Sequence, residues 1–99
     1  ETGLTAETWQ EILRVQLSNS VTDELAIGYL ATGLAQAAPA PDGDDTEDIA
    51  WARVPFREAL EAAMAGYISD ALTVAMLLRG YHMAKEGRLG AELAKAMLG

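Results

Sequence analysis

The sequence predicts an α+β protein in which a β-sheet packs against helices. Three observations support this prediction. Side chains alternate between apolar and polar over residues 9–17, residues 24–34 are apolar on both faces of a strand, and residues 56–97 carry apolar residues at helical spacing. A strand that is apolar on both faces needs a covering layer above and below its sheet. The predicted helices supply one layer, so we expect the second layer and further strands to come from outside these 99 residues.

The composition indicates one small acidic domain. The chain has 99 residues and a net charge of −8, from 15 acidic and 7 basic residues. It has no basic stripe, so we expect no binding to nucleic acid. It also has no cysteine, no signal peptide and no apolar run of the ~18 residues that a membrane span needs. These features predict a cytoplasmic protein without a membrane partner.

The first residues have the pattern of a helix end. Gly3 stands where a left-handed residue ends a helix, and Glu1 and Thr2 would belong to its last turn. Because a helix needs more than one turn to form, we expect this element to begin upstream and the chain to be a piece of a longer domain.

Three strands are expected in the first half of the chain. Residues 9–17 predict a strand with one solvent-facing side, and residues 24–34 predict a central strand, since Gly28 and Gly33 disfavour a helix there. A loop rich in proline, glycine and acidic residues follows at 37–47. The alternation then resumes and predicts a third strand over Asp48–Val54.

The second half predicts three helices. Pro55 begins the first, Phe56–Ala65, and Gly66 ends it. Its expected apolar side comprises Phe56, Ala59, Leu60, Ala63, Met64 and Tyr67, with Arg57, Glu58 and Glu61 opposite.

The second helix, Tyr67–Leu78, is apolar on nearly every side. Ser69 and Asp70 supply the oxygen cap and negative charge that favour its start. We expect a sheet to cover one side and another helix or subunit to cover the rest, which predicts a homodimer. Gly80 and Gly87 should loosen the chain before a last short helix with an apolar side of Leu89, Leu93 and Met97.

In this order the segments resemble the C-terminal part of a Nudix hydrolase of the ADP-ribose pyrophosphatase type. The Nudix box ends in Arg-Glu-apolar-x-Glu-Glu-x-Gly-apolar, and Glu1–Leu4 is similar to its tail. Leu17–Glu24 is similar to the strand-turn-strand that follows the box, and Thr46–Leu78 to the family's closing strand, helix, glycine and terminal helix. The resemblance therefore implies that residues 1–99 are the C-terminal portion of one Nudix domain and require its missing N-terminal half.

The resemblance also implies a fold and a reaction. The fold would be an α/β/α sandwich around a mixed sheet. The reaction would be Mg²⁺- or Mn²⁺-dependent hydrolysis of the pyrophosphate bond in a nucleoside diphosphate linked to a sugar; ADP-ribose would give AMP and ribose 5-phosphate. Carboxylate and phosphate oxygens suit Mg²⁺, which can also help to activate water. Such relatives are often dimers whose subunits share substrate pockets.

The same resemblance implies metal-binding and catalytic roles for several carboxylates. Glu1 matches a metal-ligand position of the box. In relatives with this ending, a carboxylate from the corresponding acidic loop acts as or positions the general base; by the spacing to Ile49, Glu47 is the first choice and Asp45 the second. A solvated charge run is the alternative for this loop. Asp23 and Glu24 are candidates for the substrate cleft or for capping strand ends.

Three other side chains could each have a functional or a structural role. Arg53 suits a phosphate contact or an exposed strand position, and Trp9 and Trp51 suit base stacking or the core. His82, the single histidine, is expected to be a packing or surface residue and not a metal ligand.

Three functions remain open at this point. The first is the pyrophosphatase, inactive as this piece alone. The second is a Nudix-like domain that senses a nucleotide sugar without cleaving it. The third is a stand-alone α+β interaction module in which the match at Glu1–Leu4 is coincidental. The Arg-Glu-apolar-x-Glu stretch expected upstream separates them, because its carboxylates hold the metal.

Overall fold

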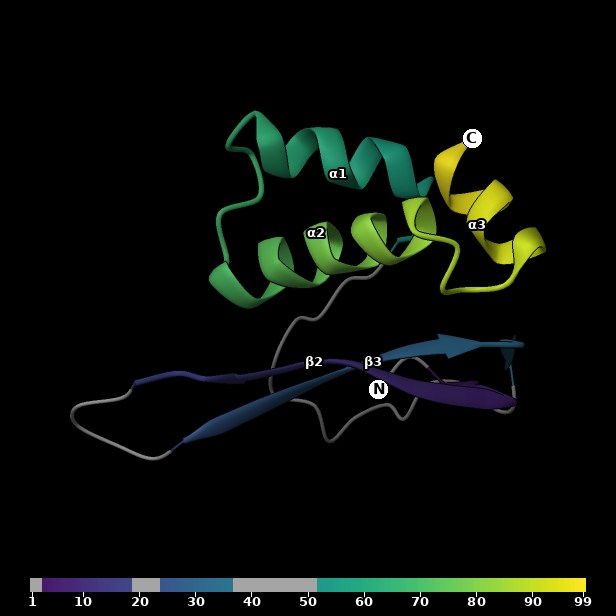
Figure 1. The fold of residues 1–99 in the computed structure, drawn as a ribbon, viewed down its shortest axis with the longest axis horizontal. Helices are drawn as coiled ribbons and strands as arrows, with labels where there is room; N and C mark the ends of the chain where they lie inside the picture. Colours follow the sequence, from purple (N-terminus) through teal and green to yellow (C-terminus); the bar gives the residue numbers. More distant parts are fainter. Residues whose placement is uncertain (1–2, 19–23, 37–51) are drawn as a thin grey trace. The chain divides into compact units, whose positions relative to one another are not determined.

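The structure, a computed structural model drawn in Figure 1, describes residues 3–18, 24–36 and 52–99. Within them, antiparallel strands occupy the first half of the chain and three α-helices the second, so the predicted α+β class is confirmed. The chain divides into two units, Glu1–Arg53 and Val54–Gly99, each with its own network of contacts.

The first unit contains one long hairpin with an interruption. β2 (Thr8–Gln16) pairs with β3 (Leu25–Thr32), and β1 (Leu4–Thr5) pairs with β4 (Ala35–Gln36). The short pair keeps the register of the long pair, because Thr8 faces Thr32 and Thr5 faces Ala35. The two sheets are therefore successive parts of the same hairpin.

Gly33 forms the interruption between the two pairs. The N–H of Glu7 donates to the carbonyl oxygens of Thr32 and Gly33 at 2.9 and 3.2 Å. Gly33 has a φ of +70°, and a Cβ added there would lie 2.8 Å from the Cβ of Glu7. Only glycine meets both requirements without strain, so this residue permits the chain to cross from β3 to β4.

The strand predictions are confirmed in part. Residues 9–17 contain β2, in which Leu13 and Val15 are half-buried and Arg14 and Gln16 are exposed, as the alternation predicts. Residues 24–34 contain β3, and the covering layer and neighbouring strands expected from outside these 99 residues remain a prediction. Among the described residues, β3 pairs with β2 alone and every second side chain from Leu25 to Tyr29 is exposed.

The predicted third strand and mixed sheet do not appear in the described part of the chain. Residues 48–51 lie outside it, and Ala52, Arg53 and Val54 are exposed and form no strand. Alternating side chains alone do not make a strand, because its backbone groups also need a partner strand. All described strand pairs are antiparallel, so the parallel pairing of a mixed sheet is not observed among them.

The second unit consists of α1 (Phe56–Met64), α2 (Ala71–Lys85) and α3 (Ala91–Leu98). Each helix packs against the other two. Arg57 Nη1 on α1 also donates to the carbonyl oxygen of Leu98 at the end of α3, 2.9 Å away. The core of this unit contains Leu60, Ala63, Gly80, Met83, Ala84, Leu89 and Met97.

The predicted helix ends at Gly66 and Asp70 are confirmed. Gly66 has a φ of +93°, and the N–H groups of Gly66 and Tyr67 donate to Ala63 and Ala62, which is a Schellman ending for α1. Asp70 caps α2, because its carboxylate accepts from the Thr73 N–H at 2.9 Å and from Thr73 Oγ1 at 2.8 Å.

The predicted limits of the second helix are wrong. α2 begins at Ala71, after the cap, and continues through Gly80 to Lys85. A Cβ added at Gly80 would lie 3.4 Å from Met97 Cε and 3.7 Å from Phe56 Cε1, so Gly80 is a contact point for α1 and α3 and not a break.

The predicted apolar side of α1 also includes two residues that are exposed in the structure. Met64, the last residue of α1, is 56% exposed, and Tyr67 is 87% exposed because it lies beyond the end of the helix at Gly66. Leu60 and Ala63 are buried, and Arg57, Glu58 and Glu61 are exposed as predicted.

Candidate functional site

Most of the predicted site residues lie outside the described residues. This holds for Glu1, Asp23, Asp45 and Glu47, so their proposed roles remain predictions. Glu24 is described: it is exposed at the start of the returning strand, and its carbonyl oxygen accepts from the Leu17 N–H at 3.1 Å. This backbone bond does not involve the Glu24 side chain, so both interpretations of Glu24 remain predictions.

The pairing of β1 with β4, which we call the β1–β4 junction, lies next in the chain to both candidate segments. Leu4 ends the segment similar to the Nudix box and faces Gln36, which lies six positions before Asp42, the first residue of the acidic stretch. The hydroxyl of Thr5 donates to the Ala35 carbonyl oxygen at 3.3 Å. The sequence carries no signal for this pairing, because each strand has only two residues.

Chain connectivity limits how far the carboxylate of Glu1 can lie from the junction. Consecutive Cα atoms are about 3.8 Å apart, so the Cα of Glu1 lies within ~11 Å of the Cα of Leu4. The acidic stretch begins at Asp42, a few residues after Gln36. The eleven residues from Gln36 to Glu47 can span up to ~40 Å, so the proximity of the predicted metal ligand and the predicted base stays a prediction.

The charge of the chain is concentrated in the same unit. Glu1–Arg53 carries ten acidic and two basic residues, whereas Val54–Gly99 carries five of each. Five of these acids stand between Asp42 and Asp48. Such a concentration of carboxylates suits a divalent cation, which prefers oxygen ligands.

The described residues alone do not form a metal site. Across residues 3–18, 24–36 and 52–99, no three His, Cys, Asp or Glu side chains come together. Glu1 and the acidic stretch, whose carboxylate oxygens suit Mg²⁺, lie outside these ranges, so the magnesium site stays a prediction. His82 is exposed on α2, which confirms its interpretation as a surface residue.

Glu11 and Arg14 form an ion pair that the sequence analysis missed. Arg14 Nε and Nη2 donate to the two carboxylate oxygens of Glu11 at 3.0 and 2.9 Å. This hydrogen bonding lowers the pKa of the Glu11 carboxyl and raises the pKa of Arg14. Residues three apart in a regular strand point to opposite faces, but the register shifts between Glu11 and Leu13, and this bulge places both side chains on one face.

Two further candidates lie at the surface. Trp9 on β2 is exposed, so its interpretation as a core residue is wrong for the described structure. Arg53 is also exposed but lies outside any strand, and its phosphate role stays a prediction. Trp51 lies outside the described residues.

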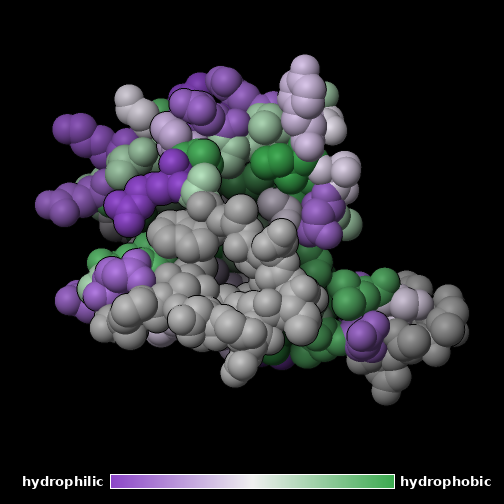
Figure 2. Space-filling view, turned by 180° about the vertical axis from the view of Figure 1, so that it is seen from behind, coloured by the Kyte–Doolittle hydropathy of each residue, from purple (hydrophilic) through white to green (hydrophobic). Residues whose placement is uncertain are grey.

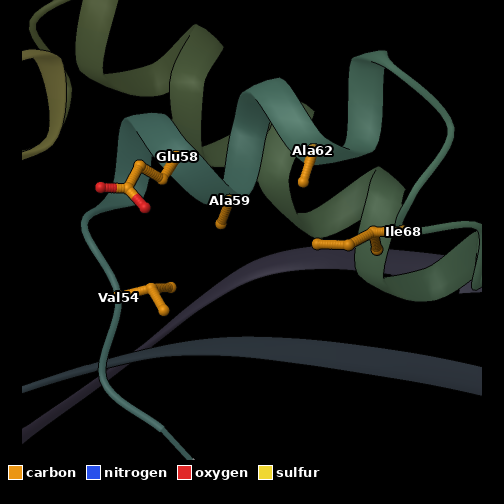
Figure 3. Close-up of a pocket in the computed structure, with 5 residues that line it drawn as sticks. All are labelled: Val54, Glu58, Ala59, Ala62 and Ile68. Atoms are coloured by element: carbon orange, nitrogen blue, oxygen red, sulfur yellow. The ribbon is translucent and has the colours of Figure 1, made fainter.

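A small hollow lies on the helical unit and is shown in Figure 3. Val54, Ala59, Ala62 and Ile68 line it with apolar groups, and Glu58 is the one charged residue of the lining. Its volume is about 230 Å³. Pockets for drug-sized ligands are typically ~300–1,000 Å³. The hollow is therefore too small for a nucleotide sugar and suits an apolar side chain.

Comparison with known proteins finds one informative relative. The chain is 30% identical over 78 residues to an ADP-ribose pyrophosphatase from Mycobacterium tuberculosis. The matched region is 79% of this chain but 38% of that protein, so the chain spans well under half of the relative's length. No family model matches the chain. The chain is thus similar in sequence to a pyrophosphatase, which is a hydrolase. Among the described residues, no helix is both long enough and apolar enough to cross a membrane.

Proposed function

We propose that this chain is the C-terminal part of a Nudix hydrolase that cleaves the pyrophosphate bond of a nucleoside diphosphate linked to a sugar, with ADP-ribose as the first candidate substrate. The observation that carries the proposal is the similarity to an ADP-ribose pyrophosphatase over 79% of the chain. The β1–β4 junction is compatible with it, because Leu4, at the end of the segment similar to the Nudix box, pairs with Gln36 in the strand that precedes the acidic stretch.

The proposed roles follow the chemistry of the carboxylates. Glu1 holds Mg²⁺ or Mn²⁺ together with upstream carboxylates, and the bound cation would neutralise phosphate charge. Glu47, or Asp45 in its place, takes a proton from the attacking water as its oxygen bonds to one phosphorus and the bridging P–O bond breaks. Asp23 and Glu24 contact the substrate.

The proposed partners are the rest of the domain and a second subunit. The relative is matched over only 38% of its length, which supports an active protein longer than these 99 residues. The apolar character of α2 supports further burial, since Val74–Leu77 are half-buried and Leu78 is exposed. We place the protein in the cytoplasm.

The test is hydrolysis by the parent protein. With ADP-ribose and Mg²⁺ it should release AMP and ribose 5-phosphate, and EDTA should stop the release. Glu47→Gln should slow turnover by about 10²-fold or more, the usual contribution of a general base. Asp42→Asn, in the same acidic stretch, is the matched control and should have a much smaller effect.

Two outcomes contradict this proposal. Product release that is indifferent to EDTA removes the metal-dependent mechanism. Calorimetric binding of ADP-ribose without cleavage favours instead a domain that senses nucleotide sugars. The 99-residue chain alone should release no AMP, because it carries only the tail of the box.

A further inference from the structure

The four methionines of the chain all lie in the helical unit, but they differ widely in exposure. Met64 is 56% exposed, Met76 is half-buried, and Met83 and Met97 are only 4% and 6% exposed. Figure 2 shows that hydrophobic side chains of the described residues reach the surface beside hydrophilic ones. An aliphatic side chain is chemically inert at the surface, whereas a methionine thioether there can react with an oxidant.

Met64 is the last residue of α1, and its side chain takes no part in ending that helix. The chain turns away through backbone hydrogen bonds that the N–H groups of Gly66 and Tyr67 donate. A polar group added to the Met64 side chain would therefore stay in contact with water and leave these bonds intact.

Met97 has the opposite environment. It lies on α3, and its Cε is 3.4 Å from the position that a Cβ on Gly80 of α2 would occupy. The ring of Phe56, on α1, is 3.7 Å from the same position. Met97 therefore lies where the three helices meet, and Met83 is buried on α2 to a similar degree.

A hydroperoxide oxidises methionine by transferring one oxygen atom. A lone pair of the sulfur attacks the outer peroxide oxygen, the O–O bond breaks, and the proton of the transferred oxygen passes to the leaving oxygen, which departs as water or an alcohol. The sulfur loses two electrons and the peroxide gains them. The product is a polar sulfoxide, which disrupts an apolar core.

We propose that Met64 is the site at which hydroperoxides modify the folded protein, whereas Met83 and Met97 react only when the helical unit opens and then hinder its refolding. Susceptibility to oxidation follows exposure, which favours Met64. A buried side chain reacts through the small fraction of molecules in which its surroundings are open. Because sulfoxide reductases reverse the product, oxidation of Met64 is a reversible modification that the fold tolerates. This chemistry is independent of the proposed hydrolysis.

Peptide mass spectrometry of the 99-residue chain treated with hydrogen peroxide tests the proposal. Trypsin places Met83 and Met97 in separate peptides and leaves Met64 with Met76 in one peptide, whose fragment spectra distinguish the two. Met64 should gain its oxygen at least about tenfold faster than Met83 and Met97, because opening limits the reaction of the buried groups. In concentrated urea the rates should become similar. Far-UV circular dichroism should be unchanged after Met64 has reacted.

Two leucine variants assign the fast reaction. Met64→Leu should remove the fast uptake of oxygen and keep the helical dichroism, since leucine is similar in volume and does not react. Met76→Leu is the matched control on α2 and should leave the fast uptake unchanged.

Oxidation of the unfolded chain tests the role of the buried methionines. After peroxide treatment in urea and dilution, the wild type should recover less helical dichroism than an untreated sample. The double variant Met83→Leu, Met97→Leu should recover its dichroism after the same treatment, because leucine keeps the apolar volume and takes up no oxygen.

Four outcomes overturn the proposal. The first is an equal oxidation rate for Met64, Met83 and Met97 in the folded chain. The second is loss of helical dichroism in step with the oxidation of Met64. The third is full recovery of dichroism by wild type that was oxidised in urea. The fourth is a parent protein in which Met64 reacts as slowly as Met83, because the rest of the domain then covers it.

Discussion

The side chain of Asp70 caps the first turn of α2 and so helps to determine where this helix begins. Its carboxylate accepts hydrogen bonds from the N–H and the hydroxyl of Thr73, and these bonds lower its pKa from the ordinary value of 3.8. The charged carboxylate is therefore preferred in the folded state. It stabilises the fold above the unfolded-state pKa, and this contribution disappears as the pH falls through the lower folded-state pKa.

We expect Asp70→Ala to lower the thermal midpoint of the helical unit near pH 7, because the first turn of α2 loses its cap. The difference from wild type should shrink as the pH falls below 3.8. Asp70→Asn is the control, since asparagine caps well without titrating. Circular dichroism melting curves from neutral to acid pH measure both variants; a constant difference at all pH values contradicts the assignment.

Alanine substitutions at two glycines of the helical unit should change its stability in opposite directions. Gly66 has a φ of +93° and open space around it, so alanine there is strained by backbone conformation alone, by about 1 kcal/mol. Gly80 lies inside α2, and a Cβ would meet only the mobile end of Met97 at 3.4 Å and the Phe56 ring. Gly80→Ala should stabilise by up to about 1 kcal/mol, the gain in helix propensity.

Urea denaturation followed by circular dichroism measures these two changes. Gly80→Val is the control for space, because its two extra methyl groups crowd Phe56 and Met97 and should make the variant less stable than Gly80→Ala. A Gly80→Ala variant that loses more stability than Gly66→Ala would show that the contacts of α2 are tighter than the structure indicates.

Elements whose pattern is local were predictable from the sequence. The alternation near Leu13 and Val15 predicted β2, and Pro55, Gly66 and Asp70 marked helix ends through their own backbone and hydrogen-bonding preferences. Gly80 misled the prediction, because its helical role depends on Phe56 and Met97, which are distant in the sequence. The bulge beside Ile12 was also missed, since the regular strand period assigns Glu11 and Arg14 to opposite faces.

The Gly33 interruption should control the β1–β4 junction. Gly33→Ala would force a φ of +70° on alanine and place its Cβ 2.8 Å from that of Glu7. We expect the hairpin to lose about 1–3 kcal/mol, the usual cost of such strain. Hydrogen exchange of the Glu7 N–H, which donates to Thr32 and Gly33, should accelerate. Leu34→Ala is the control, because Leu34 is 53% exposed; equal effects of the two variants would contradict the role of Gly33.

At the scale of the whole molecule, the candidate site was predictable only as a set of residue types. The acidic stretch and the similarity at Glu1–Leu4 are visible in the sequence. The pairing of Leu4 with Gln36 is not visible in the sequence, because it joins strands of two residues far apart in the chain. So short a pairing has no periodicity to detect, and it forms because the register of β2 and β3 continues through it.

The two units should unfold in separate steps. Both tryptophans lie in Glu1–Arg53 and all described helices lie in Val54–Gly99, so fluorescence and far-UV circular dichroism report on different units. Each unit has its own network of contacts, and the fluorescence and dichroism transitions should therefore not coincide.

Salt should distinguish these two transitions. The first unit carries ten acidic and two basic residues, so its folded state suffers repulsion that salt screens, whereas the helical unit carries five of each. Raising NaCl from ~10 mM to ~1 M shortens the screening length from ~30 to ~3 Å. The fluorescence midpoint should rise and the dichroism midpoint should change little. An equal shift of both midpoints would mean that general salt effects, and not the uneven charge, set the response.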